Sequence, residues 1–375
     1  MKKKILQLTT VHPSLDTRIF QRFATATSKE KNFESILLNA NNDNFIKKGV
    51  KIISTTKTKN IFYRIIINQI IIYRKILKIK PDLIHFHDPE LLLLGFFLKI
   101  KNFKIIYDVH ENYQKKFKSK KGLISILTKF IIPFIYKILI SLIGKKFDAI
   151  TCASIKLKKI YQPYNKTVIN IENFSIFEMF EKEKLELKKK KFKRKLVYTG
   201  GITYYRGAKQ IIDTLNKFKE NNYELIICGR NNLDLEKKLQ YKILDKRIKI
   251  IGKIKIEKVF KLMQRASIGV LLNEKIFDYD NAVPNKLFEY LSLGLPIVAS
   301  NFGIWKNIIE KYQIGELCDP NSLDEIDASI KKVFSNYSYY IDNYIKNFED
   351  IKKKFLWNKK KNVLIQLYNN LLHKC

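Results

Sequence analysis

The chain has 375 residues, about two and a half times the ~150 residues of a typical domain, so two domains are expected. Its composition is 46% hydrophobic and 13% aromatic, which supports packed cores and excludes a disordered chain. The 72 Lys and Arg residues exceed the 35 Asp and Glu residues by 37, and such an excess is typical of proteins that meet nucleic acid or a membrane surface.

The N-terminus and the cysteines indicate the compartment. The basic start, MKKK, is followed by a short apolar stretch that polar residues soon interrupt, which predicts a buried strand rather than a signal peptide. The cysteines are far apart and form no C-x-x-C pair, so no disulfide framework or zinc knuckle is predicted. A reducing cytoplasm is therefore the expected location.

Apolar, strand-like runs alternate with helix-length segments in both halves of the chain. Strands are predicted in the first half at Ile5–Leu8, Ser35–Leu38, Leu83–His87, Lys104–Val109 and Ala149–Thr151. In the second half they are predicted at Leu196–Thr199, Glu224–Cys228, Ile248–Ile251, Ile268–Leu272 and Pro296–Ala299. Ile61–Lys80 and Ala208–Lys219 are predicted helices between them. Because the strands are continuously apolar, both faces of each sheet should be covered, which predicts parallel, doubly wound sheets.

A highly charged segment, 178–195, separates the two halves and is predicted to be an inter-domain connection. The expected fold class is α/β, with two Rossmann-like domains, 1–177 and 196–349, that face a cleft. A C-terminal helix at about 350–375 is expected to pack back on the first domain. Ligands of such sheets bind beyond the carboxyl ends of the strands.

Histidines and carboxylates gather after the first-half strands. They are His12, His85, His87 and His110, with Asp16, Asp88, Asp108 and Glu111. This grouping predicts a polar cleft. A metal site is one interpretation, because His85 and His87 share a strand face near carboxylates. The favoured alternative is that these side chains cap helices and bind a substrate hydroxyl, because no further histidine ligand is expected from the second half.

Gly200 and Gly201 follow a second-half strand and precede Arg206 and a helix. Paired glycines let backbone N–H groups approach a phosphate, and the next helix adds a positive dipole end. Arg206 supplies a fixed fork of donors for phosphate oxygens. The alternative is an ordinary strand–turn–helix with a solvent-exposed arginine.

A further helix is predicted to begin after Pro284. Lys286, Glu289 and Tyr290 lie three or four residues apart and share one face of it. A lysine beside a carboxylate suits a nucleotide diphosphate sugar, since the ammonium meets the diphosphate and the carboxylate accepts the ribose hydroxyls. The alternative is a surface ion pair, worth only roughly a few tenths of a kcal/mol.

Five motifs occur in order over almost the whole chain. They are HPSLDTRIF, HFHDPELL, IYDVHE, YTGGITYYRG and VPNKLFEYLSLGLPIVAS. Together they resemble bacterial glycosyltransferases of the GT-B fold, family 4 (glycosyltransferase group 1), of the kind found in surface-polysaccharide gene clusters, including those for O-antigen and capsule. The resemblance implies a retaining, metal-independent transferase without a cofactor. Its donor would be a nucleotide diphosphate sugar, and its acceptor lipid-linked or a saccharide.

The resemblance also implies roles for single residues. Glu289 would hold the donor ribose, and His110 would face the donor sugar. Asn281 replaces the first acidic residue of the family's E-x7-E element. Its amide can hydrogen-bond a donor-sugar hydroxyl but carries no charge. Asp16 is a candidate for orienting or deprotonating the acceptor hydroxyl, although retention requires no general base.

The diphosphate clamp is implied in the same way. The family's usual arginine after the strand-end glycine is here Gly201. That leaves Arg206 and Lys286 as the expected clamp, together with backbone N–H groups near Gly200 and Gly201.

A lysine-flanked segment, 115–146, raises the question of a membrane. Its apolar part, 122–144, is long enough to span a bilayer. The strands on either side of it should share a sheet, which argues against a span. A structural helix of the first domain and a helix lying in the membrane interface remain as interpretations. The membrane hypothesis is peripheral attachment of a cytoplasmic protein to the inner face of the cell membrane, through an anionic surface.

Two other functions fit parts of the sequence. A GT-B-fold sugar-nucleotide epimerase would share the donor site. A nucleic-acid-binding protein would explain the charge, but the lysines are spread over nearly every segment and the aromatic residues lie in apolar runs. We therefore expect no nucleic-acid partner.

Overall fold

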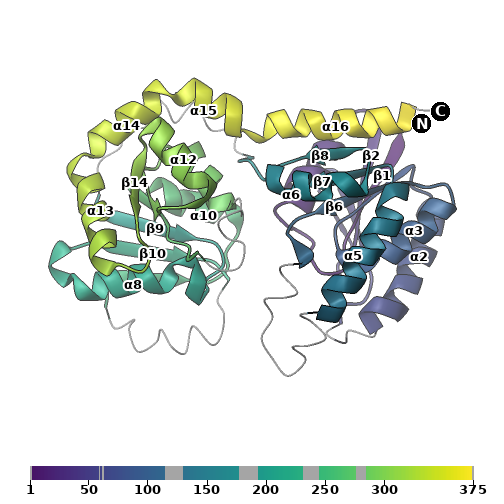
Figure 1. Cartoon of the computed structure of the whole chain (residues 1–375), viewed down its shortest axis with the longest axis horizontal. Helices are drawn as coiled ribbons and strands as arrows, with labels where there is room; N and C mark the ends of the chain where they lie inside the picture. The colour runs from purple at the N-terminus through teal and green to yellow at the C-terminus, as the bar shows by residue number, and fades with distance from the viewer. Residues whose placement is uncertain are drawn as a thin grey trace. The chain divides into compact units, whose positions relative to one another are not determined.

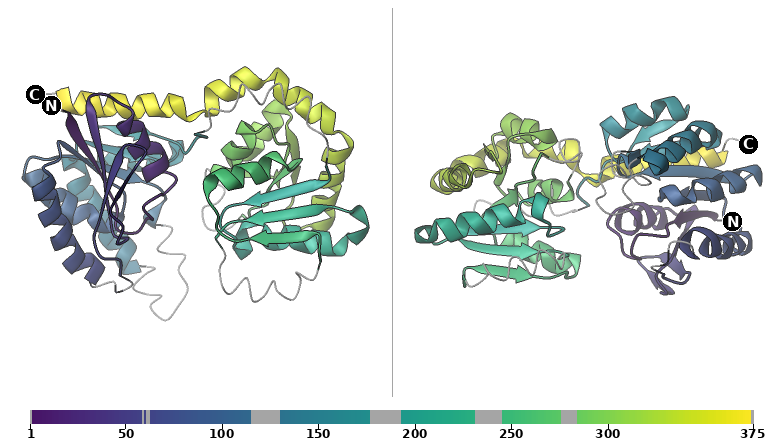
Figure 2. Two further views of the ribbon diagram at one scale, coloured as in Figure 1. Left: turned by 180° about the vertical axis from the view of Figure 1, so that it is seen from behind. Right: turned by 60° about the horizontal axis from the view of Figure 1, so that its bottom comes forward.

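The computed structural model describes residues 2–58, 60, 63–114, 130–176, 193–230, 245–275 and 284–373. The chain divides into two compact units, of which unit 1 contains Met1–Ile176 and Trp357–Cys375, and unit 2 contains Phe177–Leu356. Figures 1 and 2 show that each unit is built around one sheet with helices on both faces. Most of the predicted connection 178–195 lies outside the described residues.

Unit 1 contains an eight-stranded sheet with the order β3-β4-β2-β1-β5-β6-β7-β8. Its strands are β1 (Lys3–Leu8), β2 (Phe33–Asn39), β3 (Phe45–Lys47), β4 (Val50–Ser54), β5 (Leu83–Phe86), β6 (Lys104–Val109), β7 (Ala149–Cys152) and β8 (Val168–Asn170). All neighbours pair in parallel except β3 with β4. The expected parallel sheet is therefore confirmed for every strand but β3.

The exception is a hairpin. Lys48 and Gly49 connect β3 to β4 with φ values of 49° and 74°. A two-residue turn with both φ values positive matches the right-handed twist of an antiparallel pair, and Gly49 adopts this backbone without strain. The three-residue strand β3 is too short and too exposed to give an apolar signal in the sequence.

The helices of unit 1 cover both faces of the sheet. They are η1 (Ile19–Ala24), α1 (Thr25–Ser28), η2 (Tyr63–Ile67), α2 (Asn68–Ile79), η3 (Pro89–Leu91), α3 (Leu92–Ile100), α5 (Ile132–Ile143), η5 (Gly144–Lys146), α6 (Ile155–Tyr161), η6 (Gln162–Tyr164) and α16 (Trp357–His373). One core contains side chains of α2, α3, α5 and α6, and a second contains side chains of η1, α1 and α16. Helix α16, although last in the chain, thus packs in the core of unit 1.

The predicted apolar segment 122–144 is described only from residue 130 onward. There α5 buries Tyr136 and Ile140 in the core of unit 1, as a structural helix would. Within the described ranges, no helix combines the length and apolar character needed to cross a bilayer.

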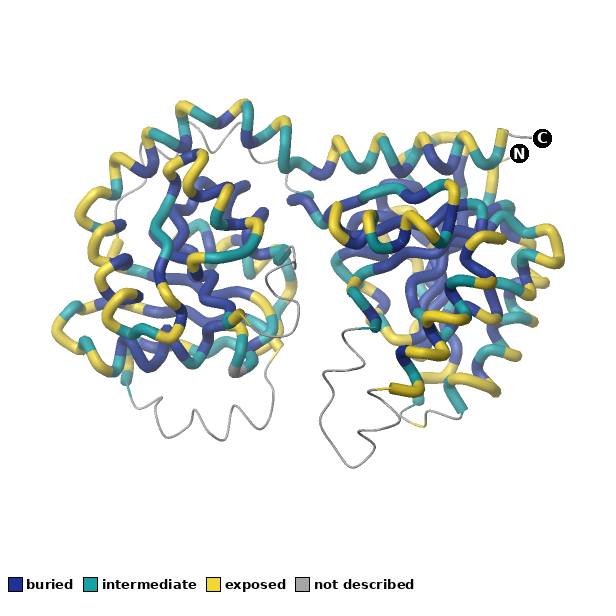
Figure 3. The backbone as a smooth tube through the Cα atoms, viewed as in Figure 1, coloured by how far each residue is buried: buried dark blue, intermediate teal, exposed yellow. Residues whose placement is uncertain are grey.

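Unit 2 contains a six-stranded, fully parallel sheet with the order β11-β10-β9-β12-β13-β14. Its strands are β9 (Lys195–Thr199), β10 (Glu224–Cys228), β11 (Ile248–Ile251), β12 (Ile268–Leu271), β13 (Ile297–Ser300) and β14 (Gly315–Cys318). Its helices are η7 (Tyr204–Arg206), α8 (Ala208–Lys217), η8 (Lys219–Asn221), α10 (Ile256–Gln264), α11 (Asn285–Ser292), α12 (Gly303–Tyr312), α13 (Leu323–Ser335), α14 (Tyr337–Lys346) and α15 (Phe348–Phe355). The central strands are buried, as Figure 3 shows.

Each sheet has a point where the strand order reverses. In unit 1 the chain adds β2 and β4 on one side of β1 and β5 to β8 on the other. In unit 2 it adds β10 and β11 on one side of β9 and β12 to β14 on the other. Ligands of doubly wound sheets bind at this point, beyond the carboxyl ends of the strands. The loops after β1 and β5, and after β9 and β12, are therefore the places to look for chemistry.

Candidate functional site

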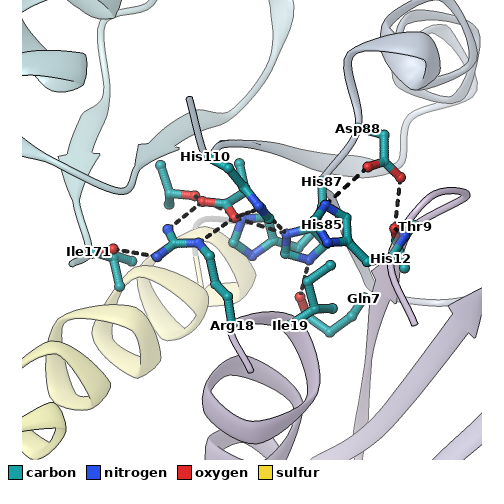
Figure 4. A network of polar contacts seen from close by, with 12 residues as sticks. Gln7, Thr9, His12, Arg18, Ile19, His85, His87, Asp88, His110 and Ile171 are labelled. Atoms are coloured by element: carbon teal, nitrogen blue, oxygen red, sulfur yellow. Dashed lines mark hydrogen bonds and ion pairs between the residues drawn. The ribbon is translucent and has the colours of Figure 1, made fainter. Parts of the chain in front are cut away.

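The buried carboxylate of Asp108, at the end of β6, is the centre of a polar cluster in unit 1 (Figure 4). Arg18 grips it with two hydrogen bonds, of 2.8 Å from Nε and 2.7 Å from Nη2. His110 Nε2 lies 2.6 Å from Oδ2, and His87 Nδ1 lies 2.9 Å from it. Thr151 Oγ1 donates to Oδ1 at 2.7 Å. The carboxylate is thus saturated with donors.

Electrostatics keep Asp108 charged and His87 neutral. Burial alone would raise the pKa of Asp108, but the charges of Arg18 and His110 hold it well below the usual range. Burial lowers the pKa of His87 to about 4, although the hydrogen bond to Asp108 opposes this shift. Near neutral pH, the deep part of the cluster therefore contains one ion pair and a neutral imidazole.

His85 lies deeper still. Its Nδ1 lies 2.8 Å from the Tyr368 hydroxyl of α16, and its Nε2 lies 2.9 Å from Thr151 Oγ1. Both His85 and His87 are fully buried. The expectation that they line an open cleft is therefore wrong, because β5 points both rings into the core. His12 and His110 are the histidines of this group that reach the surface of unit 1.

Asp16 lies at the rim of the cluster, in the loop after β1. One carboxylate oxygen, Oδ1, accepts the backbone N–H groups of Arg18 at 2.7 Å and Ile19 at 2.9 Å, at the start of η1. The other lies 3.4 Å from His12 Nδ1. Burial alone would raise the pKa of Asp16, but the hydrogen bond and charge of His12 bring it below the ordinary range. Asp16 therefore has a structural role in addition to its predicted chemical one.

Substitutions of Asp16 separate these two roles. An asparagine still offers an oxygen to the N–H groups of Arg18 and Ile19, so Asp16→Asn should leave the free energy of unfolding nearly unchanged. Asp16→Ala removes the acceptor and should cost about 1 kcal/mol. Urea denaturation of both variants measures this difference. An Asn variant as unstable as the Ala variant would contradict the capping role.

One group of side chains in unit 1 has the ligand types of a metal centre. The ligand atoms of His87, Asp108 and His110 all lie within 4.8 Å of one another. This differs from the predicted pair, because His85 is replaced by His110. The group suits a cation poorly, since both oxygens of Asp108 already accept hydrogen bonds from the positive guanidinium of Arg18.

In unit 2, the glycine loop after β9 is closely packed against its neighbours. Gly200 has φ of 107°, and a Cβ on Gly229 would lie 1.6 Å from the Gly200 carbonyl oxygen. A Cβ on Gly201 would lie 3.2 Å from Nη1 of Arg206, so that guanidinium lies against the loop. Arg206 itself is exposed, directly before Gly207 and α8. The loop, the arginine and the start of α8 thus lie together, as predicted.

Lys286, in the first turn of α11, is buried, with 7% of its surface exposed. Its Nζ has no hydrogen-bond partner among the described residues and lies 3.9 Å from the centre of the Tyr198 ring. Burial and the nearby charge of Arg206 lower the pKa of Lys286 well below its usual value, while Glu289 opposes the shift. A buried ammonium without an acceptor is costly, and an anion would satisfy it.

Arg206, Lys286 and Glu289 therefore act on one another electrostatically, as the sequence predicts for a clamp. Asn281 lies outside the described residues. The tyrosine below Lys286 was not anticipated. Tyr198 occupies a strand position in an apolar run, and its hydroxyl donates to the Gly201 carbonyl at 2.9 Å. Only the fold brings it under the ammonium.

Comparison with known proteins identifies unit 2. Residues 179–354 match the family model described as glycosyl transferases group 1, which is nearly the whole of this unit. Unit 2 is a group 1 glycosyltransferase domain. The family predicted from the motifs is thereby confirmed.

The group 1 glycosyltransferase domain also accounts for a curated relative. An uncharacterized glycosyltransferase of Methanocaldococcus jannaschii is 24% identical over 168 residues, which is 44% of this chain. The match spans 41% of that protein's length.

Solved structures show the fold of the whole chain. Sucrose-phosphate synthase from Thermosynechococcus elongatus superposes with a TM-score of 0.77 at 14% identity, over 100% of both chains. HepE from Anabaena, solved in complex with UDP-glucose, gives a TM-score of 0.72 at 13% identity, over 98% of this chain and 99% of that one. Both have the GT-B fold, and the prediction of two Rossmann-like domains is confirmed.

Proposed function

We propose that the chain is a retaining, metal-independent glycosyltransferase that takes a sugar from a nucleotide diphosphate sugar. The observation that carries the proposal is Lys286, a buried ammonium without a hydrogen-bond acceptor within the described residues, beside a glycine loop and Arg206. A diphosphate supplies the missing acceptors. HepE, which has the same fold, was solved with UDP-glucose.

The chemical problem is the leaving group, which gains negative charge as the glycosidic bond breaks. Arg206, Lys286 and the N–H groups near Gly200 and Gly201 would stabilise that charge, so that no metal ion is needed. Such preorganised donors cost no reorganisation during the reaction. Glu289 would accept the ribose hydroxyls, and Asn281 a donor-sugar hydroxyl.

Unit 1 would supply the rest of the reaction. His110 would face the donor sugar. Because its Nε2 lies 2.6 Å from Asp108, the neutral ring carries its proton there and leaves Nδ1 as an acceptor for a sugar hydroxyl. Asp16, at the rim, would orient the acceptor hydroxyl. Equal turnover by wild type and Asp16→Asn would remove Asp16 from the mechanism.

The acceptor would be lipid-linked or a saccharide, in the assembly of a bacterial cell-surface polysaccharide. The five motifs of this branch support that assignment. The reaction would take place in the cytoplasm, with the protein held peripherally on the inner face of the membrane, where a lipid-linked acceptor is presented.

A screen of nucleotide sugars for protection against thermal unfolding tests the proposal. The protective donor is then incubated with candidate acceptors, and the products are identified by mass spectrometry. Sugar joined to the acceptor supports a transferase. Free nucleotide with an epimerised sugar, formed without acceptor, indicates an epimerase instead. Nanomolar, salt-dependent binding of DNA or RNA without donor protection would replace the proposal by a nucleic-acid function.

Glu289→Ala should mainly weaken nucleotide binding, by about tenfold or more, because a charged acceptor for two hydroxyls is lost. Calorimetry with the nucleotide alone measures the effect. Glu257→Ala, an exposed carboxylate on α10, is the matched control and should bind as wild type does. Unchanged affinity in the Glu289 variant would contradict the ribose role.

Arg206→Ala should lower turnover ~10²–10³-fold, because one fixed donor to the leaving group is lost. Arg206→Lys keeps the charge without the two-pronged geometry and should fall between alanine and wild type. Arg265→Ala changes an exposed arginine of the same unit and serves as control. A near-normal rate in the alanine variant would rule out the clamp.

A further inference from the structure

Three helices of unit 1 present large apolar side chains to solvent. Phe134 and Leu142 on α5 are 63% and 66% exposed, and Phe97 and Ile100 on α3 are 58% and 59% exposed. Ile66 in η2 and Ile70 in α2 are exposed in the same way. Single exposed apolar residues need no explanation, but a group on adjacent elements marks an interaction site. We call this surface of η2, α2, α3 and α5 the apolar face.

The three helices lie next to one another on one side of the unit 1 sheet, as Figure 1 shows. Each buries a second apolar stripe in the core beneath, with Ile72 of α2, Leu98 of α3 and Ile140 of α5 as examples. Their outward residues are therefore not the inward stripe misplaced. Helices that are apolar on both sides require a cover on the outer side as well.

The charge on these helices is of one sign. Residues 63–80, 92–101 and 130–146 contain no Asp or Glu, although the chain has 35 of them. Arg74, Lys78, Lys137, Lys145 and Lys146 are exposed on the same helices or directly after them. Apolar side chains surrounded by lysine and arginine alone match an anionic bilayer surface.

The same charge argues against other covers. Two copies of this chain would bring like charges together across a self-complementary contact, which costs free energy. A spanning role does not fit either, because the 12 residues of α5 extend only about 18 Å, against ~30 Å of hydrocarbon.

We propose that the apolar face docks on an anionic lipid bilayer, with α5 and α3 lying flat in the headgroup region. This rests on the proposed function, in which a lipid-linked acceptor reaches unit 1 from that bilayer. Helices α2, α3 and α5 all follow strands whose carboxyl ends form the edge with His110 and Asp16, so docking would hold that edge at the membrane.

Vesicle sedimentation with the full chain tests the proposal. Wild type should bind phosphatidylglycerol-containing vesicles at moderate salt and bind pure phosphatidylcholine weakly. The triple variant Phe97→Gln, Phe134→Gln, Leu142→Gln should bind at least about tenfold more weakly, because its apolar insertion is lost. The control triple, Ile46→Gln, Ile304→Gln, Tyr339→Gln, changes exposed apolar residues elsewhere and should bind as wild type does.

A second pair of variants tests the charge. Lys137→Gln with Lys146→Gln should lose roughly fivefold for each lysine. Lys258→Gln with Lys261→Gln removes the same charge from α10 of unit 2 and should have no effect. Equal losses in both pairs would mean general attraction of a basic protein and would overturn the proposal.

Two further measurements complete the test. Analytical ultracentrifugation reports whether the apolar triple converts a dimer to monomers without changing vesicle binding, which would replace the bilayer by a second copy. Turnover with a water-soluble acceptor should be the same in all variants. If wild type binds vesicles but transfers no sugar, the proposed function fails while the docking surface stands. If it transfers sugar and ignores vesicles, the reverse holds.

Discussion

Replacing Lys286 by methionine should remove most of the turnover and yet make the ligand-free protein harder to unfold. Turnover should fall ~10²–10³-fold, because the leaving group loses a preorganised donor. The free energy of unfolding should rise, because a buried ammonium without an acceptor is replaced by an apolar side chain of similar length. Steady-state kinetics and urea denaturation measure the two effects. Lys306→Met, at an exposed lysine of α12, should change neither.

The same variant should change the pH dependence of stability. In wild type, the pKa of Lys286 lies below its ordinary value of 10.5 in the folded chain. Between the lowered pKa and 10.5 the unfolded chain holds the proton and the folded chain does not, so stability rises with pH over that range. This rise should be missing in Lys286→Met. A diphosphate should restore the proton, so calorimetry in buffers of different ionisation enthalpy should detect proton uptake on nucleotide binding. Binding without uptake, in both proteins alike, would contradict the clamp.

Asp108→Asn should destabilise unit 1 by about 3–5 kcal/mol, because it leaves the buried guanidinium of Arg18 without a counter-charge. Arg18→Met should cost about as much, for the converse reason, and the double variant should cost less than the sum. The two tryptophans separate the units, since Trp305 lies in unit 2 and Trp357 in unit 1. In a Trp305→Phe background, Trp357 fluorescence therefore reports the unfolding of unit 1.

Two observations provide the control. Lys217→Met breaks an exposed ion pair with Asp324 and should cost at most about 1 kcal/mol. His87 adds a pH dependence, because its pKa falls from 6.5 to about 4 on folding. The unfolded chain takes up the proton first as pH falls, so stability of unit 1 should decrease between about 6.5 and about 4. Additive losses in the double variant would mean that Arg18 and Asp108 act independently.

The central strands could be predicted because burial on both faces gives them an unbroken apolar signal. Lys104–Val109, for example, is a strand with the predicted bounds. The edge strands lack that signal: β8 has three residues, and β14 is mostly half-buried. Their existence depends on a neighbour to pair with, which no local pattern records.

The site shows the same division. That His87, Asp108 and His110 would meet follows from the rule that parallel strands end at one edge. That Arg18 would neutralise Asp108, 90 residues away, has no local signal. Tyr368, whose hydroxyl accepts a hydrogen bond from Gln7 361 residues earlier, has none either. The polar Gln7 within an apolar strand is the one hint of a buried network.

The division of the chain also constrains the order of folding. Unit 1 contains residues from both ends of the chain, whereas unit 2 is continuous. During synthesis, Phe23, Leu83 and Ile106 lack their partners on α16 until the last helix leaves the ribosome. Unit 2 can complete its sheet before that moment. The first domain to be translated is therefore the last to be finished, and its apolar surface is exposed to chaperones or to aggregation in the interval.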